Sequence, residues 1–153
     1  VIEGPMLAHK ASAEGHIFAE RIAGNNPVLN YGCIPAVIYT EPEVAWVGPT
    51  EKELQEKGIV YKKGIFPFTA NARAKTTGDT EGIVKTIFNK ETGELIGAHL
   101  IGSDVTELIN SLSVAKSLET TEIELMKTVF AHPTLSETLH ESVLSAYDKA
   151  IHI

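Results

Sequence analysis

Residues 8–23 alternate apolar and polar positions in the way that an amphipathic helix requires. The apolar positions at helical spacing are Ile17, Phe18, Ile22 and Ala23. Gly24 stands where helices commonly end, and the Gly-Asn-Asn-Pro sequence at residues 24–27 is typical of a turn or linker. The pattern predicts one helix followed by a domain boundary between about residues 24 and 35.

Residues 36–68 contain runs rich in β-branched and aromatic side chains, which favour strands. The predicted strand segments are residues 36–40, 44–47 and 59–68. Thr50 and Glu53 have the spacing of a capping box, and Gly58 ends the short helix that this box begins. Residues 70–78 are polar and are predicted to form a loop.

The clearest β-signal is a hairpin whose turn contains Thr92 and Gly93. On its first strand, the residues that alternate with Ile83, Lys85 and Ile87 are Val84, Thr86 and Phe88. On the return strand, one apolar face is predicted to contain Ile96, Ala98 and Leu100, and the other face Leu95, His99 and Ile101. His99 is expected at an exposed or edge position.

Helices are predicted after the hairpin. Asp104 and Glu107 form a capping pair for the first, whose apolar positions are Val105, Leu108, Ile109, Leu112 and Ala115. A shorter helix is predicted over residues 122–129, and a last one begins at Leu135 with an apolar stripe of Leu139, Val143, Ala146, Tyr147 and Ala150. The order of elements predicts an α+β fold, an antiparallel β-sheet with helices packed on one face.

Composition and charge narrow the function classes. The 153 residues are 43% hydrophobic, enough for a core, and their net charge of −7 argues against nucleic acid or an anionic membrane surface as a partner. No apolar run approaches the roughly 18 residues of a membrane span, and no signal peptide opens the chain. The first residue is Val1 rather than Met, so we expect a fragment of a longer protein.

The sequence gives little support for cysteine chemistry or for a metal site. Cys33 is the only cysteine, which fits a reducing compartment and an unreactive position in a linker or first strand. Glu137, His140 and Glu141 contain one E-x-x-H unit, but di-metal sites need two, and the H-E-x-x-H zinc motif is incomplete. We therefore expect no metal. The chain also contains no dinucleotide-binding glycine loop, P-loop or G-x-S-x-G motif.

Candidate chemistry lies in the sequence Ala-His-Pro-Thr-Leu-Ser-Glu at residues 131–137. Pro133 keeps His132 out of helical geometry, and Thr134 with Glu137 has capping-box spacing. A chain reversal here could bring the Glu137 carboxylate to one imidazole nitrogen of His132 and make the other a general base. Spacing alone favours the plainer interpretation, in which Glu137 only caps the helix and His132 is a loop histidine.

Four sequence blocks, in the same order, closely resemble the flavin-dependent disulfide oxidoreductases. The blocks are GPMLAHKA at residues 4–11, VIYTEPEVAWVG at 37–48, FPFTANARAKT at 66–76 and AHPTLSE at 131–137. Within that family the resemblance is closest to the dihydrolipoamide dehydrogenases. It implies that residues 34–153 are the interface (dimerisation) domain of a homodimer and that residues 1–26 are the C-terminal remnant of an FAD-binding domain.

The resemblance also implies site residues and cofactors. His132 would be the base that takes a proton from the substrate dithiol in the partner subunit's active site, with Glu137 as its orienting partner. Pro133 would lie near the partner's flavin. The segment implied to contact the chain's own flavin is Met6, Leu7, Ala8 and His9. The full-length enzyme would use FAD and NAD, whereas we expect neither to bind this chain tightly, because the glycine-rich loops and the redox cysteine pair are absent from it.

The implied partner of the full-length enzyme is the lipoyl domain of a 2-oxoacid dehydrogenase complex, in the bacterial cytoplasm or the mitochondrial matrix. Alternatives remain open: the interface domain of a related reductase such as glutathione reductase, or a catalytically silent dimerisation module. An exposed aromatic patch of Tyr39, Trp46, Phe66 and Phe68 would favour an oligomer interface over core packing. The C-terminal Ala-Ile-His-Ile does not match the C-terminal redox cysteines of mercuric reductases or large thioredoxin reductases.

Overall fold

Five strands form one antiparallel sheet in the computed structural model, which describes residues 4–152 and leaves Val1 outside that range. The strands are β1 (Ala36–Ile38), β2 (Glu43–Val47), β3 (Tyr61–Pro67), β4 (Gly82–Asn89) and β5 (Leu95–Gly102). Their order across the sheet is β1-β2-β5-β4-β3, and every neighbouring pair is antiparallel. The hairpin predicted around Thr92 and Gly93 is therefore the β4–β5 pair, and β5 is the central strand.

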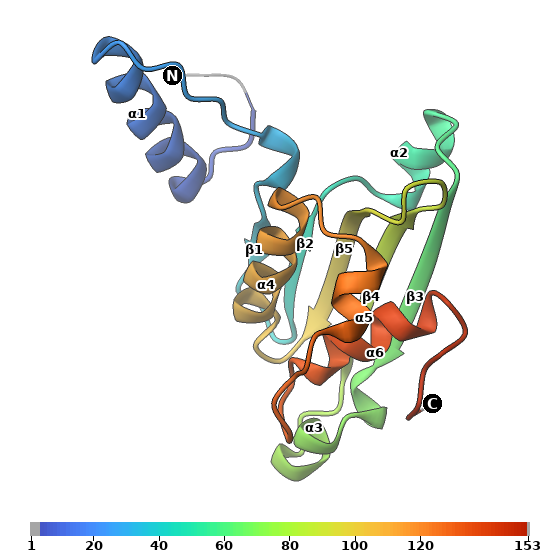
Figure 1. The fold of residues 1–153 in the computed structure, drawn as a ribbon. Helices are drawn as coiled ribbons and strands as arrows, with labels where there is room; N and C mark the ends of the chain where they lie inside the picture. Colours follow the sequence, from blue (N-terminus) through green and yellow to red (C-terminus); the bar gives the residue numbers. More distant parts are fainter. Residues whose placement is uncertain (1–3, 153) are drawn as a thin grey trace.

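Helices α4 and α6 cover one face of this sheet, which confirms the predicted α+β fold (Figure 1). The helices are α1 (Ala8–Ile22), α2 (Glu51–Glu56), α3 (Ala72–Thr77), α4 (Val105–Ser117), α5 (Glu122–Lys127) and α6 (Glu137–Ser145), with short 3-10 turns at Tyr31–Cys33 and Phe68–Ala70. Helix α4 packs on β2 and β5, whereas α6 packs on β3 and β4. No helix of the described residues is long and apolar enough to cross a membrane.

The core lies between the sheet and helices α4 and α6. It combines alternate residues of the strands with the apolar stripes of both helices. The strand members are Ala45, Val47, Val84, Phe88, Leu95, Ala98 and Leu100, and the helix members include Val105, Leu108, Ile109, Leu112, Leu139 and Val143. Phe66 and Phe68 are also buried, whereas Tyr39 is 77% exposed and Trp46 is half-buried, so the four aromatics do not form one exposed patch.

A β-bulge corrects the predicted face of Leu95. The register shifts between Ile87 and Phe88, so that Ile87 pairs with Gly97 while Phe88 pairs with Leu95. The extra residue, Ile96, moves Leu95 to the core face, where it is fully buried. Strict alternation, which placed Leu95 on the other face, fails at such a bulge.

His99 was predicted to be exposed or at a sheet edge, and this is wrong. It lies on the central strand between Trp46 of β2 and Lys85 of β4. Both ring nitrogens are buried and have no hydrogen-bond partner among the described residues. The hairpin signal located the strand but gave no information about its place in the sheet.

Two helix predictions also need correction. The segment predicted as a loop over residues 70–78 contains α3, because the Asn71 side chain accepts a hydrogen bond from the Ala74 backbone N–H and caps a short helix. Asp104 precedes α4 as predicted but does not cap it with its side chain, since its backbone is left-handed, with φ of 57°. The Thr50–Glu53 capping box and the stop at Gly58 are confirmed.

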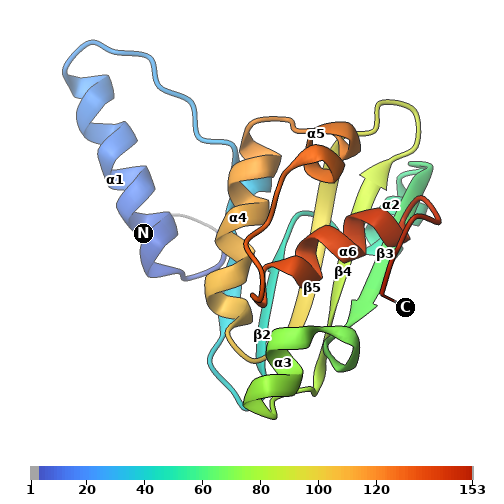
Figure 2. The ribbon, with the colours of Figure 1, turned by 60° about the horizontal axis from the view of Figure 1, so that its bottom comes forward.

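Helix α1 is formed as predicted, but it lies away from the sheet in both ribbon views (Figures 1 and 2). Its apolar residues Phe18 and Ile22 are 67% and 73% exposed. Among residues 4–152, these two side chains of the amphipathic pattern are therefore largely uncovered. Such an exposed apolar stripe is typical of a surface that another segment or chain covers.

Candidate active site

The loop before α6 owes its position to the packing of α6 on strand β3. The two elements meet at Gly64, where a Cβ atom would overlap the backbone carbonyl oxygen of Ser142. Only glycine permits this close approach. The helix therefore lies directly on the strand, and its first residue, Glu137, is held at the edge of the domain.

The structure brings His132 and Glu137 together. The His132 Nδ1 atom lies 3.0 Å from Oε1 and 3.2 Å from Oε2 of Glu137. The Thr134 backbone N–H donates to Oε2 at 2.9 Å, and the Thr134 hydroxyl donates to the Ala131 carbonyl oxygen at 2.7 Å. The peptide bond between His132 and Pro133 is cis. The chain reverses between residues 132 and 137, which brings the carboxylate back to the imidazole.

The predicted capping box at this position is only half formed. The Glu137 carboxylate accepts from the Thr134 backbone, but the Thr134 hydroxyl turns to Ala131 instead of capping the helix. Residues 135–136 form a turn, so α6 begins at Glu137 rather than at Leu135, and it ends at Ser145 rather than continuing to Ala150. The side chain of Glu137 is consequently used by the loop and by the histidine.

Asn71 stabilises this turn from a distant part of the chain, and sequence reasoning missed it. Its side-chain N–H donates to the Thr134 carbonyl oxygen at 3.0 Å. Asn71 itself is 4% exposed and also caps α3. The available signal was its place in the FPFTANARAKT block, one of the four blocks that carry the family resemblance.

Electrostatics favour a charged Glu137 beside an imidazole with one free nitrogen. Partial burial raises the pKa of Glu137, but the hydrogen bonds from the Thr134 backbone and the His132 ring outweigh it, so the pKa lies below its usual value. An ionised carboxylate only accepts hydrogen bonds, so Nδ1 of His132 must carry the donated hydrogen. Nε2 of the neutral ring then keeps its lone pair, and this nitrogen can accept a proton.

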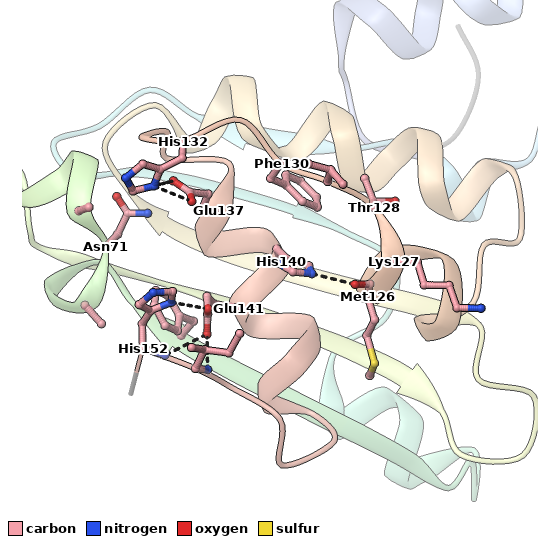
Figure 3. A pocket seen from close by; sticks show the side chains of 15 residues that line it. Asn71, Met126, Lys127, Thr128, Phe130, His132, Glu137, His140, Glu141 and His152 are labelled. Carbon is pink, nitrogen blue, oxygen red and sulfur yellow. Dashed lines mark hydrogen bonds and ion pairs between the residues drawn. The ribbon is translucent and has the colours of Figure 1, made fainter.

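His132 and Glu137 line a cavity of about 390 Å³ at the edge of the domain (Figure 3). The His132 side chain is 69% exposed and that of Glu137 is 25% exposed, so the ring reaches outward while the carboxylate is sheltered. The same cavity is lined by a second pair, Glu141 and His152, which sequence reasoning did not identify. No short-range signal could have found it, because the tail must fold back over α6 to form it.

The contacts of His140, in the E-x-x-H unit, are those of a residue that stabilises the fold. Its Nε2 lies 3.1 Å from the Met126 carbonyl oxygen, and its ring stacks on Phe130 with centroids 5.2 Å apart. Among residues 4–152, no group of three or more His, Cys, Asp and Glu side chains could hold a metal ion. These contacts connect α6 to α5 and to residues 128–136, which link the two helices.

The residues implied to contact flavin lie at two separate places. Met6 is fully exposed, and Leu7 and Ala8 stand at the start of α1, where no side chain caps the helix. His9 approaches the linker, with Nε2 2.7 Å from the Pro35 carbonyl oxygen. Pro133 lies on the loop before α6, far from α1 (Figure 1). One chain therefore does not bring these two places together.

Similar sequences identify the family to which the chain belongs. A family profile described as the pyridine nucleotide-disulphide oxidoreductase dimerisation domain matches residues 34–143. The dihydrolipoyl dehydrogenase of Zymomonas mobilis is 52% identical over 154 residues, which cover 99% of this chain and 33% of that protein. The mitochondrial dihydrolipoyl dehydrogenase of Dictyostelium discoideum is 49% identical over 152 residues, with 99% and 31% coverage. The chain therefore spans about a third of the length of these relatives.

Solved structures agree with the fold. LpdA from Mycobacterium tuberculosis superposes with a TM-score of 0.84 at 28% identity, covering 90% of this chain and 30% of that one. The copper(II) complex of RclA, an HOCl-induced flavoprotein disulfide reductase from Escherichia coli, gives a TM-score of 0.83 at 25% identity, covering 92% and 32%. In both cases this chain corresponds to under a third of a larger protein.

Proposed function

The chain belongs to the pyridine nucleotide-disulphide oxidoreductase family as its dimerisation domain, and we propose that it serves a dihydrolipoyl dehydrogenase in which His132 is the general base. The observation that carries the proposal is the contact of 3.0 Å between His132 Nδ1 and Glu137 Oε1. About 50% identity to dihydrolipoyl dehydrogenases over nearly the whole chain supports the choice of substrate class. In this proposal residues 1–26 are a remnant of an FAD-binding domain and residues 34–153 form the interface domain.

The proposed reaction starts with a proton transfer to His132. A thiol with its ordinary pKa is a weak nucleophile at neutral pH, so the substrate dithiol needs a base. Its S–H proton moves to Nε2, and the ionised Glu137 stabilises the imidazolium that forms. The substrate thiolate then attacks a disulfide sulfur contributed by the rest of the enzyme, forming a mixed disulfide and releasing the other sulfur as a thiolate.

The cofactor proposal divides the flavin contacts between two subunits. The uncapped start of α1 and the exposed Met6 suit one edge of a flavin nucleotide, because free helix N–H groups favour an anionic group. Pro133, on the distant loop, would approach the flavin of the other subunit. FAD, when bound, supplies the redox chemistry that passes electrons from the dithiol on to NAD. We assign no residue of this chain to NAD.

The same geometry supports dimerisation. The loop before α6, which carries His132 and Pro133, lies far from α1 (Figure 1), so a site that used both places would need two copies of the chain. The proposed assembly is a homodimer with twofold symmetry. The proposed substrate-carrying partner is the lipoyl domain of a 2-oxoacid dehydrogenase complex. Relatives include bacterial and mitochondrial enzymes, and we propose one of these two compartments for this protein.

The test is His132→Gln in the full-length enzyme, with the dithiol reaction and a bypass reaction measured on the same preparation. We expect dihydrolipoamide turnover to fall roughly 10²- to 10⁴-fold, the usual contribution of a general base. Transfer of electrons from NADH to an artificial acceptor, which needs no proton from the dithiol, should change little. A control is Lys90→Gln at the exposed β4–β5 turn of the interface domain, which should leave both reactions unchanged.

Three outcomes would contradict the proposal. Full dithiol turnover in a folded His132→Gln enzyme would remove the base from His132. An equal loss of both reactions, with a lower melting temperature, would indicate that the histidine only stabilises the loop. A protein with neither reaction in its unaltered full-length form would favour the silent dimerisation module.

A further inference from the structure

The C-terminal tail is bound to α6 by a single buried carboxylate. Glu141 is 5% exposed, and its Oε2 accepts from the backbone N–H groups of Ile151 at 3.0 Å and His152 at 3.5 Å. Its Oε1 lies 2.6 Å from Nδ1 of His152. A buried carboxylate requires such partners, because burying a charge without compensation is costly. The tail therefore follows a defined course, and the His152 ring has a fixed place.

This second pair shares the cavity of His132 and Glu137. Glu137 and Glu141 are four residues apart on α6, so their side chains leave the same face of the helix. Figure 3 shows both glutamates with their histidines at one end of the cavity, His132 from the preceding loop and His152 from the tail. Two carboxylates thus stand side by side, each with an imidazole as its partner.

Other charged groups around the cavity do not take the place of His152. The His140 ring faces the Met126 carbonyl oxygen and stacks on Phe130. Lys127, at the end of α5, directs its amino group away from both pairs in Figure 3. The lining residues from β3, from the segment before α3 and from the first position of α3 are Phe66, Ala70, Asn71 and Ala72, which do not titrate.

The Glu141–His152 pair lies one helical turn from the proposed catalytic pair, and a positive charge on His152 would favour the ionised form of Glu137. Burial raises the pKa of Glu137, whereas the Thr134 and His132 hydrogen bonds lower it, and the positive charge of a protonated His152 lowers it further. Removing that charge would leave Glu141 as an uncompensated negative group one helical turn from Glu137. The His132–Glu137 pair would then take up a proton more readily.

We propose that His152, anchored by Glu141, is a positioning residue whose charge keeps the His132–Glu137 pair able to accept a proton from the dithiol at lower pH. The inference rests on the proposed function, since it deepens the role of the same site. It concerns the balance of charge in the cavity, and His152 itself takes no proton from the substrate.

The test is the pH dependence of kcat/KM for dihydrolipoamide in the full-length enzyme. In His152→Gln, which keeps a donor to Glu141 but loses the charge, we expect the acidic limb to move to higher pH by about half a unit, the order expected between partly screened surface charges. His152→Lys, which keeps a positive charge, should restore the limb. The double variant His152→Gln/Glu141→Gln, which removes both charges, should also move it back toward its original position.

Two controls separate charge from structure. High ionic strength should shrink the displacement of the His152→Gln limb, because exposed charges are screened by salt. The NADH-to-acceptor reaction of each variant reports whether the enzyme is folded, and it should stay unchanged. A purely structural role for the tail predicts a loss of rate with no displacement of the limb.

The outcomes distinguish this inference from the proposed function. The inference is overturned if the acidic limb of the pH profile does not move in His152→Gln. It is also overturned if the limb of the double variant moves as far as that of the single variant. If His132→Gln abolishes dithiol turnover while His152→Gln has no effect on the pH profile, only the inference fails. If His132→Gln retains full turnover, the proposed function fails first.

Discussion

Glu51 and Glu137 are two carboxylates that lie on opposite faces of the same sheet and are partnered in different ways. Glu51, at the start of α2, accepts from Lys63 at 2.8 Å, Lys85 at 3.0 Å and the Tyr61 hydroxyl at 2.9 Å. Glu137, at the start of α6, accepts from one backbone N–H and one imidazole. Both carboxylates stand in the first turn of a helix, where a negative charge is favoured.

The difference lies in whether the partners can exchange protons at neutral pH. Hydrogen bonds from Lys63, Lys85 and Tyr61 lower the pKa of Glu51 to about 2 despite partial burial. Ammonium and phenol groups have ordinary pKa values of about 10, so groups of these two types do not exchange protons readily at neutral pH. Such a cluster can only hold elements together. Glu137 instead faces a side chain whose ordinary pKa lies near neutrality. A carboxylate such as Glu137, beside an imidazole, can influence a proton transfer at neutral pH, whereas a carboxylate such as Glu51, beside lysines and a tyrosine, cannot.

The largest effect that separates the two sites is expected from Gly64→Ala. Gly64 lies on β3 next to Lys63, but a Cβ atom there would overlap the Ser142 carbonyl oxygen of α6. The helix that carries Glu137 must move, whereas the Glu51 cluster on the other face stays in place. We expect unfolding free energy to fall by about 3 kcal/mol, the upper range for overpacking, with a loss of dithiol turnover.

Urea unfolding and steady-state kinetics measure the two consequences of this change. Gly15→Ala is the matched control, because nothing lies within 4 Å of a Cβ atom at that position in α1. That control should be neutral or slightly stabilising, since alanine favours a helix over glycine. A Gly64→Ala protein with unaltered stability would contradict the close approach of α6 to β3.

The next effect concerns Glu137→Gln in the full-length enzyme. A neutral amide can still accept from the Thr134 backbone, but it no longer stabilises a charged His132 ring. We expect dithiol turnover to fall by roughly 10- to 10²-fold, less than for His132→Gln, because the imidazole survives. The double variant should be little worse than His132→Gln alone, since residues that act as one unit are not additive. Additive losses would show that the two side chains act independently.

The fold was predictable where the signal is local or periodic. The Thr50–Glu53 box, the β4–β5 hairpin and the apolar stripe of α4 each follow from spacing within a few residues. The contact between His132 and Glu137 also follows from a short turn. The family resemblance was confirmed by the profile match over residues 34–143.

The remaining features depend on contacts between segments that are far apart in the sequence. Asn71 stabilises the Thr134 loop across 63 residues, and the tail reaches Glu141 only after the chain reverses. The burial of His99 depends on the order of strands in the sheet, which no local pattern of residues determines. The bulge that moves Leu95 to the core likewise breaks the alternation on which strand prediction depends.

A smaller effect is expected from Glu51→Gln, measured by urea unfolding of the 153-residue chain at several pH values. The pKa of Glu51 is about 2, below its ordinary 4.5, so its contribution is fully present above pH 4.5 and is lost as pH falls toward 2. Lys63 is 48% exposed, and solvent screening reduces the contribution. We expect Glu51→Gln to cost about 1 kcal/mol at pH 7.

The pH dependence provides the control for this carboxylate cluster. The difference between Glu51→Gln and the unaltered chain should shrink steadily below pH 4.5, because protonation removes the same charge that the substitution removes. Glu56→Gln, an exposed position in the same helix, should change stability little at any pH. Equal stability of Glu51→Gln and the unaltered chain at pH 7 would show that the Glu51 cluster contributes nothing measurable to stability.

The smallest effect concerns His99, which lies on β5 between Trp46 of β2 and Lys85 of β4. Burial lowers the pKa of this histidine and nearby Lys85 lowers it further, so the folded protein binds a proton there less readily than the unfolded chain does. The free energy of unfolding should therefore fall as pH drops through the ordinary histidine value of 6.5.

His99→Phe removes two unpartnered ring nitrogens. We expect the free energy of unfolding to rise by up to about 1 kcal/mol at pH 7 and to decrease less toward pH 5 than in the unaltered chain. His16→Phe, on the exposed surface of α1, should leave the pH dependence unchanged. A His99→Phe chain that is less stable at pH 7, with the same loss toward pH 5, would mean that the imidazole is satisfied and that this face of the sheet tolerates its charge.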